Sequence, residues 1–272
     1  MDLLEFRKIT QQIRVNIIEM VAAAGTGHPG GSLSIVDILT VLYFDKMRLR
    51  VEEPKWEERD RFILSKGHAA PGLYAVLAER GFFPKKTLMT LRKFNSILQG
   101  HPDMKNTPGV DMSSGSLGQG LSVANGMALS GKLDAKDYRV YVMVGDGEIQ
   151  EGQIWEAIMT AAHYKLDNVT MFVDHNGLQI NGPNDRVMGI KPIKEKLLAF
   201  GWYVMEIDGH TMQEISEAID KAKMLKGKPT AIIAKTVKGK GVSFMENQVD
   251  WHGVAPNQEQ KHQAIAELEG TL

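Results

Sequence analysis

Short apolar runs alternate with helical patterns along most of this sequence, and this alternation constrains the fold more than any other feature. The runs are residues 61–64, 139–144, 169–173, 203–207 and 230–234. Each has the length and composition of a buried strand. Strands that alternate with helices form a mostly parallel sheet with helices on both faces. The sequence therefore predicts an α/β fold, in which ligands bind at the carboxyl ends of the strands.

Helices are predicted between and around these runs. Apolar residues recur at steps of three and four over residues 6–21, which predicts a helix that ends at Gly25. Ser34, with Asp37 three residues later, predicts the start of a helix that continues over 35–44. Thr211 and Glu214 form a predicted capping box at another helix start. Further helices are expected at 72–80, 151–164 and in a short tail at 257–272 of a single domain, 1–272.

Composition excludes several classes of function. The chain has 272 residues, with 32 basic and 33 acidic side chains and a formal net charge of −1. This balance argues against a nucleic-acid surface or a polybasic membrane anchor. Cysteine is absent, so thiolate metal sites and cysteine nucleophiles are excluded. The first residues do not have the pattern of a signal peptide, and no run reaches the roughly 20 apolar residues of a membrane span, so a cytoplasmic protein is expected.

A Gly-Asp-Gly tripeptide at 145–147 follows one predicted strand, and Asn176 follows the next, thirty residues after Asp146. Neighbouring strands lie about 5 Å apart, so their ends can share one ion. A carboxylate and an amide oxygen suit a hard cation such as Mg²⁺, and the glycines let the backbone approach a phosphate. An Asp-Gly hairpin turn is the simpler alternative. The helical spacing after Glu148 argues against it.

The tripeptide and Asn176 together resemble the thiamine-diphosphate motif. Other motifs resemble those of transketolases, in transketolase order: Gly27-His-Pro-Gly30, Ser65-Lys-Gly-His68, Gly100-His-Pro102, Gly115-Ser-Leu-Gly-Gln-Gly120 and His252-Gly-Val-Ala-Pro256. The resemblance covers essentially the whole chain and implies the thiamine-diphosphate-binding fold, with that cofactor and Mg²⁺, Ca²⁺ or Mn²⁺. Ser116 replaces a frequent proline and His175 a frequent aspartate, which leaves the branch of the family open.

The eight histidines fall into two groups. One group lies beside Gly or Pro in predicted loops and consists of His28, His68, His101 and His252. For any one of these a surface position is the simpler interpretation, but four on one scaffold favour a shared site with room for a ligand. The others are predicted to be structural or exposed: His163, His175, His210 and His262. For His210 the capping box beside it is a sufficient explanation.

The resemblance also implies roles for particular residues. His28 and His252 would face the substrate and stabilise developing charge, and His101 would contact substrate hydroxyls. The metal would be held by Asp146, Asn176 and the backbone carbonyl of Leu178. The implied cofactor contacts are His68, Gly115, Leu117, Gly147, Asn176, Ile180 and His252.

Two interpretations stay open for Glu151, and two for a group of three lysines. Glu151 is either a first-turn glutamate favoured by the helix dipole or, by resemblance, a glutamate beside the cofactor that couples two active sites across an interface. Lys235, Lys238 and Lys240 form either a mobile lid or a solvated loop. The solvated loop is preferred for any single lysine.

The resemblance implies transfer of a two-carbon glycolaldehyde unit from a ketose phosphate to an aldose phosphate. In this family the carboxylate that polarises the aminopyrimidine belongs to a second, pyrimidine-binding domain, and no second set of strands follows Pro256. We therefore expect the N-terminal subunit of a split transketolase, in an α2β2 complex with a chain that carries that domain.

Two other classes stay open. One is a subunit of another thiamine-diphosphate enzyme, either the α chain of a 2-oxo acid dehydrogenase or a protein similar to 1-deoxyxylulose-5-phosphate synthase. The His-Pro-Gly and Ser-Lys-Gly-His loops favour transketolase over these. The other is a non-catalytic paralogue that binds the cofactor, against which the intact Asp146 and Asn176 argue.

Overall fold

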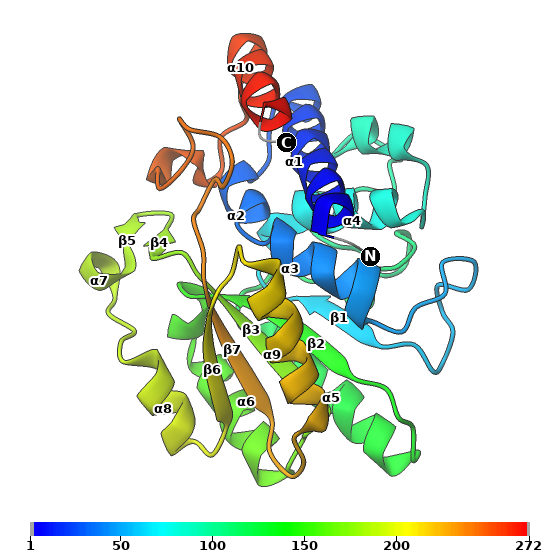
Figure 1. The fold of residues 1–272 in the computed structure, drawn as a ribbon, viewed down its shortest axis with the longest axis vertical. Coiled ribbons are helices and arrows are strands. Elements are labelled where there is room, and N and C mark those ends of the chain that lie inside the picture. Colours follow the sequence, from blue (N-terminus) through cyan, green and yellow to red (C-terminus); the bar gives the residue numbers. More distant parts are fainter. Residues whose placement is uncertain (1–2, 271–272) are drawn as a thin grey trace.

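A parallel sheet forms the centre of the protein in the computed structural model, which describes residues 3–270 (Figure 1). Its 5 strands have the order β1-β2-β3-β7-β6. They are β1 Arg61–Leu64, β2 Val140–Gly145, β3 Val169–His175, β6 Tyr203–Asp208 and β7 Thr230–Lys235. A short antiparallel pair, β4 Leu178–Gln179 and β5 Gly182–Pro183, follows β3. The predicted α/β fold with a mostly parallel sheet is confirmed, and each strand lies within two residues of its predicted bounds.

Helices surround the sheet. They are α1 Leu3–Ala24, α2 Pro29–Leu33, α3 Val36–Val41, α4 Ala70–Arg80, α5 Gln119–Leu133, α6 Gly152–His163, α7 Asn184–Val187, α8 Ile193–Ala199, α9 Met212–Met224 and α10 Gln258–Glu269. The first helix ends as predicted, because Gly25 takes a positive φ of 65° that glycine adopts without strain. The sequence did not predict α5.

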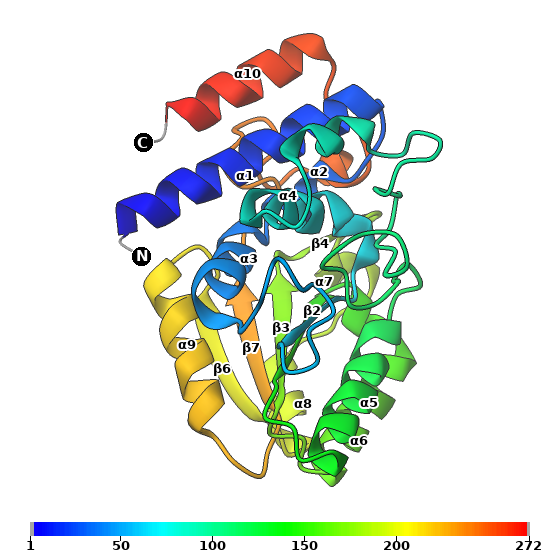
Figure 2. The same cartoon turned by 90° about the vertical axis from the view of Figure 1, so that its right-hand side faces the viewer.

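The two faces of the sheet pack against different helices. Along β2, Val140, Val142 and Val144 belong to one buried apolar cluster with residues of α5, α6 and α8. The alternate residues Tyr141 and Met143 belong to a second cluster with residues of α1, α3, α4 and α9. Successive strand residues point to opposite faces, so continuously apolar strands are the expected result of covering both. Figure 2 shows α5 and α6 on one side of the sheet and α9 on the other.

The helix predicted over 35–44 is present as α3, which a π-helix at Leu42–Lys46 continues, but the predicted cap at Ser34 is wrong. The N-cap position is Ile35, without a side-chain cap, and the separate helix α2 ends before Ser34. The Ser34 hydroxyl instead donates a hydrogen bond of 2.8 Å to the Asp174 carboxylate at the end of β3. Asp37 is buried and forms an ion pair of 2.6 Å with Arg14 of α1. Both residues therefore connect separate elements.

The predicted capping box at α9 is also wrong. Thr211 precedes the helix as expected, but its side chain caps nothing. The Glu214 carboxylate accepts a hydrogen bond of 2.9 Å from the backbone N–H of Asp208, at the end of β6. The carboxylate thus fixes the turn between strand and helix. Because there is no capping box, it cannot explain the position of His210.

Candidate functional site

A cavity of about 300 Å³ lies at the carboxyl ends of β2 and β3. These strands are neighbours, with Gly145 opposite Asp174, so the segments that follow them meet as predicted. The predicted site residues that line it are His68, Leu117, Asp146, Gly147, Glu151, Asn176, Leu178, Ile180 and His252. The structure therefore brings together most of the cofactor and metal residues expected from the sequence.

His28 adjoins this cavity through a histidine cluster, and His101 and Gly115 lie against each other. The rings of His28, His68 and His252 have centroids 5.0–5.5 Å apart, and His68 stacks on His252. Gly115 lies against the ring of His101, since a Cβ there would approach the ring atoms to 3.5 Å. The Nδ1 atom of His28 is buried without a hydrogen-bond partner. A buried polar atom of this kind is available to a bound ligand.

Two histidines of the cluster, and His101 outside it, have lowered pKa values. Burial and then the charge of Arg92 lower the pKa of His28 to about 4. Burial and then Lys238 lower the pKa of His252 to about 3. Burial and then Arg92 also lower the pKa of His101. At neutral pH these imidazoles are therefore uncharged.

Acid should destabilise the protein through this cluster. Between about pH 6.5 and pH 4 the unfolded chain binds protons that folded His28 and His252 do not, so the free energy of unfolding falls as the pH falls. We expect a loss on the order of 2 kcal/mol from pH 7 to pH 5. Urea unfolding at both pH values measures it. The double variant His28→Gln/His252→Gln should show a smaller loss, and an equal loss would contradict the assignment.

Asp146 and Asn176 form the oxygen-rich end of the cavity. The Asp146 side chain accepts hydrogen bonds from the N–H of Gly147 at 2.8 Å and of Gly177 at 2.6 Å. Burial and then the charge of Asp174 raise the pKa of Asp146. Asn176 accepts a bond of 3.1 Å from the N–H of Leu178. A divalent cation would offset the crowding of negative charge between the two aspartates.

The residues that support this end were not predicted from the sequence. Asp174 is fully buried and accepts hydrogen bonds from Lys66 at 2.5 Å and from the Asn176 amide at 2.9 Å. Burial by itself would raise the pKa of Asp174, but the ammonium group of Lys66 and the hydrogen bonds outweigh it and lower the pKa. Asp174 therefore stays ionised. Because it accepts from the NH₂ group of Asn176, the amide oxygen of Asn176 points away from Asp174. A charged residue at the end of an apolar run was the available signal.

Lys238 contradicts the preferred interpretation as a solvated loop lysine, because only 2% of it is exposed. Its ammonium group donates to Nδ1 of His252 at 2.8 Å and to the Leu178 carbonyl at 3.4 Å. An ammonium group cannot accept, so neutral His252 carries its proton on Nε2. Burial and then Lys66 lower the pKa of Lys238 to about 8. Lys235 is exposed, and Lys240 pairs with Glu246 at 3.4 Å.

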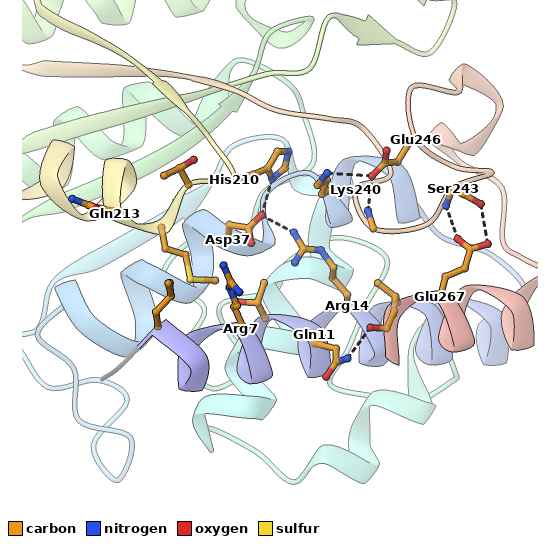
Figure 3. A pocket seen from close by; sticks show the side chains of 16 residues that line it. Arg7, Gln11, Arg14, Asp37, His210, Gln213, Lys240, Ser243, Glu246 and Glu267 are labelled. Atoms are coloured by element: carbon orange, nitrogen blue, oxygen red, sulfur yellow. Dashed lines mark hydrogen bonds and ion pairs between the residues drawn. The ribbon is translucent and has the colours of Figure 1, made fainter. Parts of the chain in front are cut away.

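A larger cavity of about 800 Å³ lies between α1, the start of α9 and the segment 240–246 (Figure 3). Several of its polar groups already have partners. Asp37 forms an ion pair with Arg14 at 2.6 Å and a hydrogen bond with Nδ1 of His210 at 2.7 Å, and Glu267 accepts from the Ser243 N–H. Among the described residues, none of the site residues predicted from the sequence lines this cavity. Nε2 of His210 accepts from the Val237 N–H at 2.9 Å, so His210 joins two loops.

The smaller cavity fits a diphosphate with a divalent cation. Lys238, His68 and His252 provide donors for an anion, while Asp146, Asn176 and the Leu178 carbonyl provide oxygens for a cation. Within residues 3–270 no group of three or more His, Asp or Glu side chains is arranged to hold a metal. A cation here therefore needs further oxygens, which phosphates supply.

A family model described as the transketolase thiamine diphosphate binding domain matches residues 6–269. The chain belongs to this family. It is 46% identical over 257 residues to the 6-deoxy-6-sulfo-D-fructose transketolase subunit SqwG of Clostridium sp. (strain MSTE9), and the match covers 94% of each chain. It is 43% identical over 259 residues to one of the subunits of an apulose-4-phosphate transketolase from Phocaeicola vulgatus, over 95% of this chain and 92% of that one.

Full-length transketolases contain this domain as a part. Human transketolase is 43% identical over 94% of this chain, which spans 41% of the human protein. The crystal structure of transketolase from Campylobacter jejuni superposes with a TM-score of 0.93 at 33% identity, over 99% of this chain and 43% of that one. The matched region thus covers nearly all of the two subunit relatives and about two fifths of human transketolase. No helix among the described residues is long and apolar enough to cross a membrane.

Proposed function

We propose that this chain is the thiamine-diphosphate-binding subunit of a two-chain transketolase, which transfers glycolaldehyde from a ketose phosphate to an aldose phosphate. The observation that carries the proposal is the cavity at the ends of β2 and β3, where donors for an anion adjoin oxygens for a cation. The histidine cluster lies beside it. Membership of the family supports the same conclusion.

The polar end of the cavity would hold the diphosphate and its metal. Asp146, Asn176 and the Leu178 carbonyl would coordinate Mg²⁺, which suits oxygen ligands. Lys238 and the N–H of Gly147 would face the phosphate oxygens. In this arrangement Lys238 can leave the Leu178 carbonyl to the metal, since their present contact is long at 3.4 Å. The cofactor, when bound, supplies the carbon nucleophile that takes up the two-carbon unit.

The histidine cluster would act on the sugar. His28 and His252 are uncharged at neutral pH, so each can exchange a proton with a substrate oxygen without a fixed charge in the cavity. His252 presents Nε2–H because Lys238 occupies its Nδ1. His101 is exposed next to Gly115 and would bind a substrate hydroxyl. Leu117 and Ile180 would pack on the cofactor rings.

A partner chain would complete the site. Large apolar side chains at or next to the cavity are exposed to solvent: Leu117 by 39%, Ile180 by 64% and Met188 by 62%. Exposed apolar groups around a binding cavity indicate a surface that another molecule covers. Both subunit relatives bear names of enzymes built from subunits. We propose that the partner carries the pyrimidine-binding domain and that the complex is an α2β2 heterotetramer, with Glu151 at the interface beside the cofactor.

Mixing the two chains tests the function. With thiamine diphosphate and Mg²⁺, the assembled complex should transfer a two-carbon unit from xylulose 5-phosphate to ribose 5-phosphate, measured by product analysis. The two subunit relatives are named for different sugars, so 6-deoxy-6-sulfo-D-fructose and apulose 4-phosphate belong in the donor panel. An assembled complex that binds the cofactor and transfers from none of these donors would contradict the proposal.

Lys238→Met should weaken cofactor binding. The substitution keeps the length of the side chain and removes a buried ammonium group, so we expect about a tenfold or larger increase in the Kd of thiamine diphosphate. Isothermal titration of the assembled complex measures it. Lys235→Met is the matched control, because Lys235 lies on the same segment but is exposed. Equal Kd values for the two variants would show that Lys238 does not face the phosphates.

A further inference from the structure

Glu148 is a buried carboxylate to which neither the sequence motifs nor the proposed reaction gives a role. It directly follows the Gly-Asp-Gly tripeptide, and only 3% of it is exposed. Its Oε1 atom accepts hydrogen bonds from the Ser65 hydroxyl at 2.5 Å and from the Gly118 N–H at 2.9 Å. Its Oε2 atom accepts from the Gly145 N–H at 3.0 Å. Both oxygens are therefore engaged.

These donors come from three separate segments that surround the cofactor cavity. Ser65 begins the segment that carries His68, Gly118 follows Leu117, and Gly145 precedes Asp146. The Ser65 hydroxyl in turn accepts from the Gly120 N–H at 3.1 Å. Gly120 lies so close to Ser65 that a Cβ would approach its side chain to 2.5 Å. One carboxylate thus connects three of the segments that line the cavity.

The chemistry of these bonds requires a carboxylate. Three donors face the side chain, and an ionised carboxylate only accepts. A glutamine of the same shape would turn its NH₂ group toward at least one of these donors. The resulting unpaired donors would be buried, which costs more than the loss of an ordinary surface hydrogen bond. The segments would then separate.

We propose that Glu148 is a positioning residue that holds the segments 65–68, 115–120 and 145–147 in the arrangement that binds thiamine diphosphate. It touches neither substrate nor the reacting atoms, and acts through the backbone of the residues that contact the cofactor. Supporting residues of this kind prepare a site before the ligand arrives. The inference rests on the proposed function in one respect, that these segments bind that cofactor.

Glu148→Gln in the assembled two-chain protein tests this. We expect the Kd of thiamine diphosphate, measured by isothermal titration with Mg²⁺, to rise about 10–100-fold. Turnover at saturating cofactor should stay close to that of the unmodified protein, because no reacting group has changed. Asp60→Asn is the matched control. Asp60 is 4% exposed and accepts from the N–H groups of Arg48 and Arg139, away from the carboxyl ends of the strands. Asp60→Asn should lower the free energy of unfolding about as much as Glu148→Gln does, and should leave the Kd of thiamine diphosphate unchanged.

A second measurement needs no cofactor. In Glu148→Gln the amides of Gly118 and Gly145 should exchange hydrogen faster than in the unmodified protein, and in Asp60→Asn they should not. If Glu148→Gln does not fold, Ser65→Ala can replace it, because it removes one of the three donors to Glu148. It should also raise the Kd of thiamine diphosphate, by a smaller factor. Unchanged Kd and unchanged exchange would overturn the inference. Failure of the unmodified complex to bind thiamine diphosphate would overturn the proposed function instead, and the exchange rates would still decide the role of Glu148.

Discussion

Asp146→Asn should abolish Mg²⁺-dependent binding of thiamine diphosphate by the assembled complex. The Asp146 carboxylate is 1% exposed at the end of β2 and lies near a second buried aspartate, Asp174. Asparagine keeps the size of the side chain but removes the negative charge that a divalent cation needs there. It also turns an NH₂ group toward the N–H of Gly147 or Gly177, which now donate to the two carboxylate oxygens.

We expect metal affinity to fall by more than about 100-fold, since the loss of an outer supporting group alone costs about 10–100-fold. Titration of Mg²⁺ at fixed cofactor measures the affinity, and sugar transfer should fall with it. Asp111→Asn is the control, because Asp111 is also buried and hydrogen-bonded but belongs to the structural contact with Arg59 and Phe62. Wild-type affinity in Asp146→Asn would exclude Asp146 as a metal ligand.

The strands could be predicted because their signal is local. Each is a short run of mostly apolar residues, and all but the edge strand β6 are buried over most of their length. Helix α5 could not be predicted in the same way. It contains Gly120, Gly126 and Gly131, which favour loops. In the structure Gly120 approaches Ser65 and Gly131 approaches the ring of Tyr138, so close packing explains two of these glycines.

The cofactor and metal residues could be predicted because they follow strand ends in short motifs. Their supporting groups could not, because these depend on contacts between distant segments. Glu148 meets Ser65 across 83 positions of sequence and Asp174 meets Lys66 across 108. The prediction that Lys238 lies in a solvated loop was wrong for the same reason. Its loop looks solvated in the sequence, but the segment folds over the cavity and its ammonium group contacts His252.

The purified chain alone should show no measurable ketol transfer, and adding the partner chain should restore it. The cavity offers groups for a diphosphate and a metal, and the resemblance to transketolases implies a further carboxylate for the aminopyrimidine, which we propose that the partner supplies. Transfer should rise with added partner and reach a plateau at an equimolar ratio. Turnover by the single chain would contradict the proposals that a partner chain is needed and that the active site is shared between the two chains.

A matched pair of methionines separates assembly from folding in this experiment. Met188 is 62% exposed, and its carbonyl accepts a hydrogen bond from Gln150 at the edge of the cavity. Met224 is 74% exposed at the end of α9, away from the cavity. A charge placed in a contact surface must be desolvated when the partner binds, whereas a charge on a free surface stays in water.

Met188→Asp should therefore prevent assembly and transfer, measured by size-exclusion chromatography and product analysis, while Met224→Asp should retain both. Loss of assembly in both variants, or in neither, would show that the apolar groups around the cavity do not bind the partner.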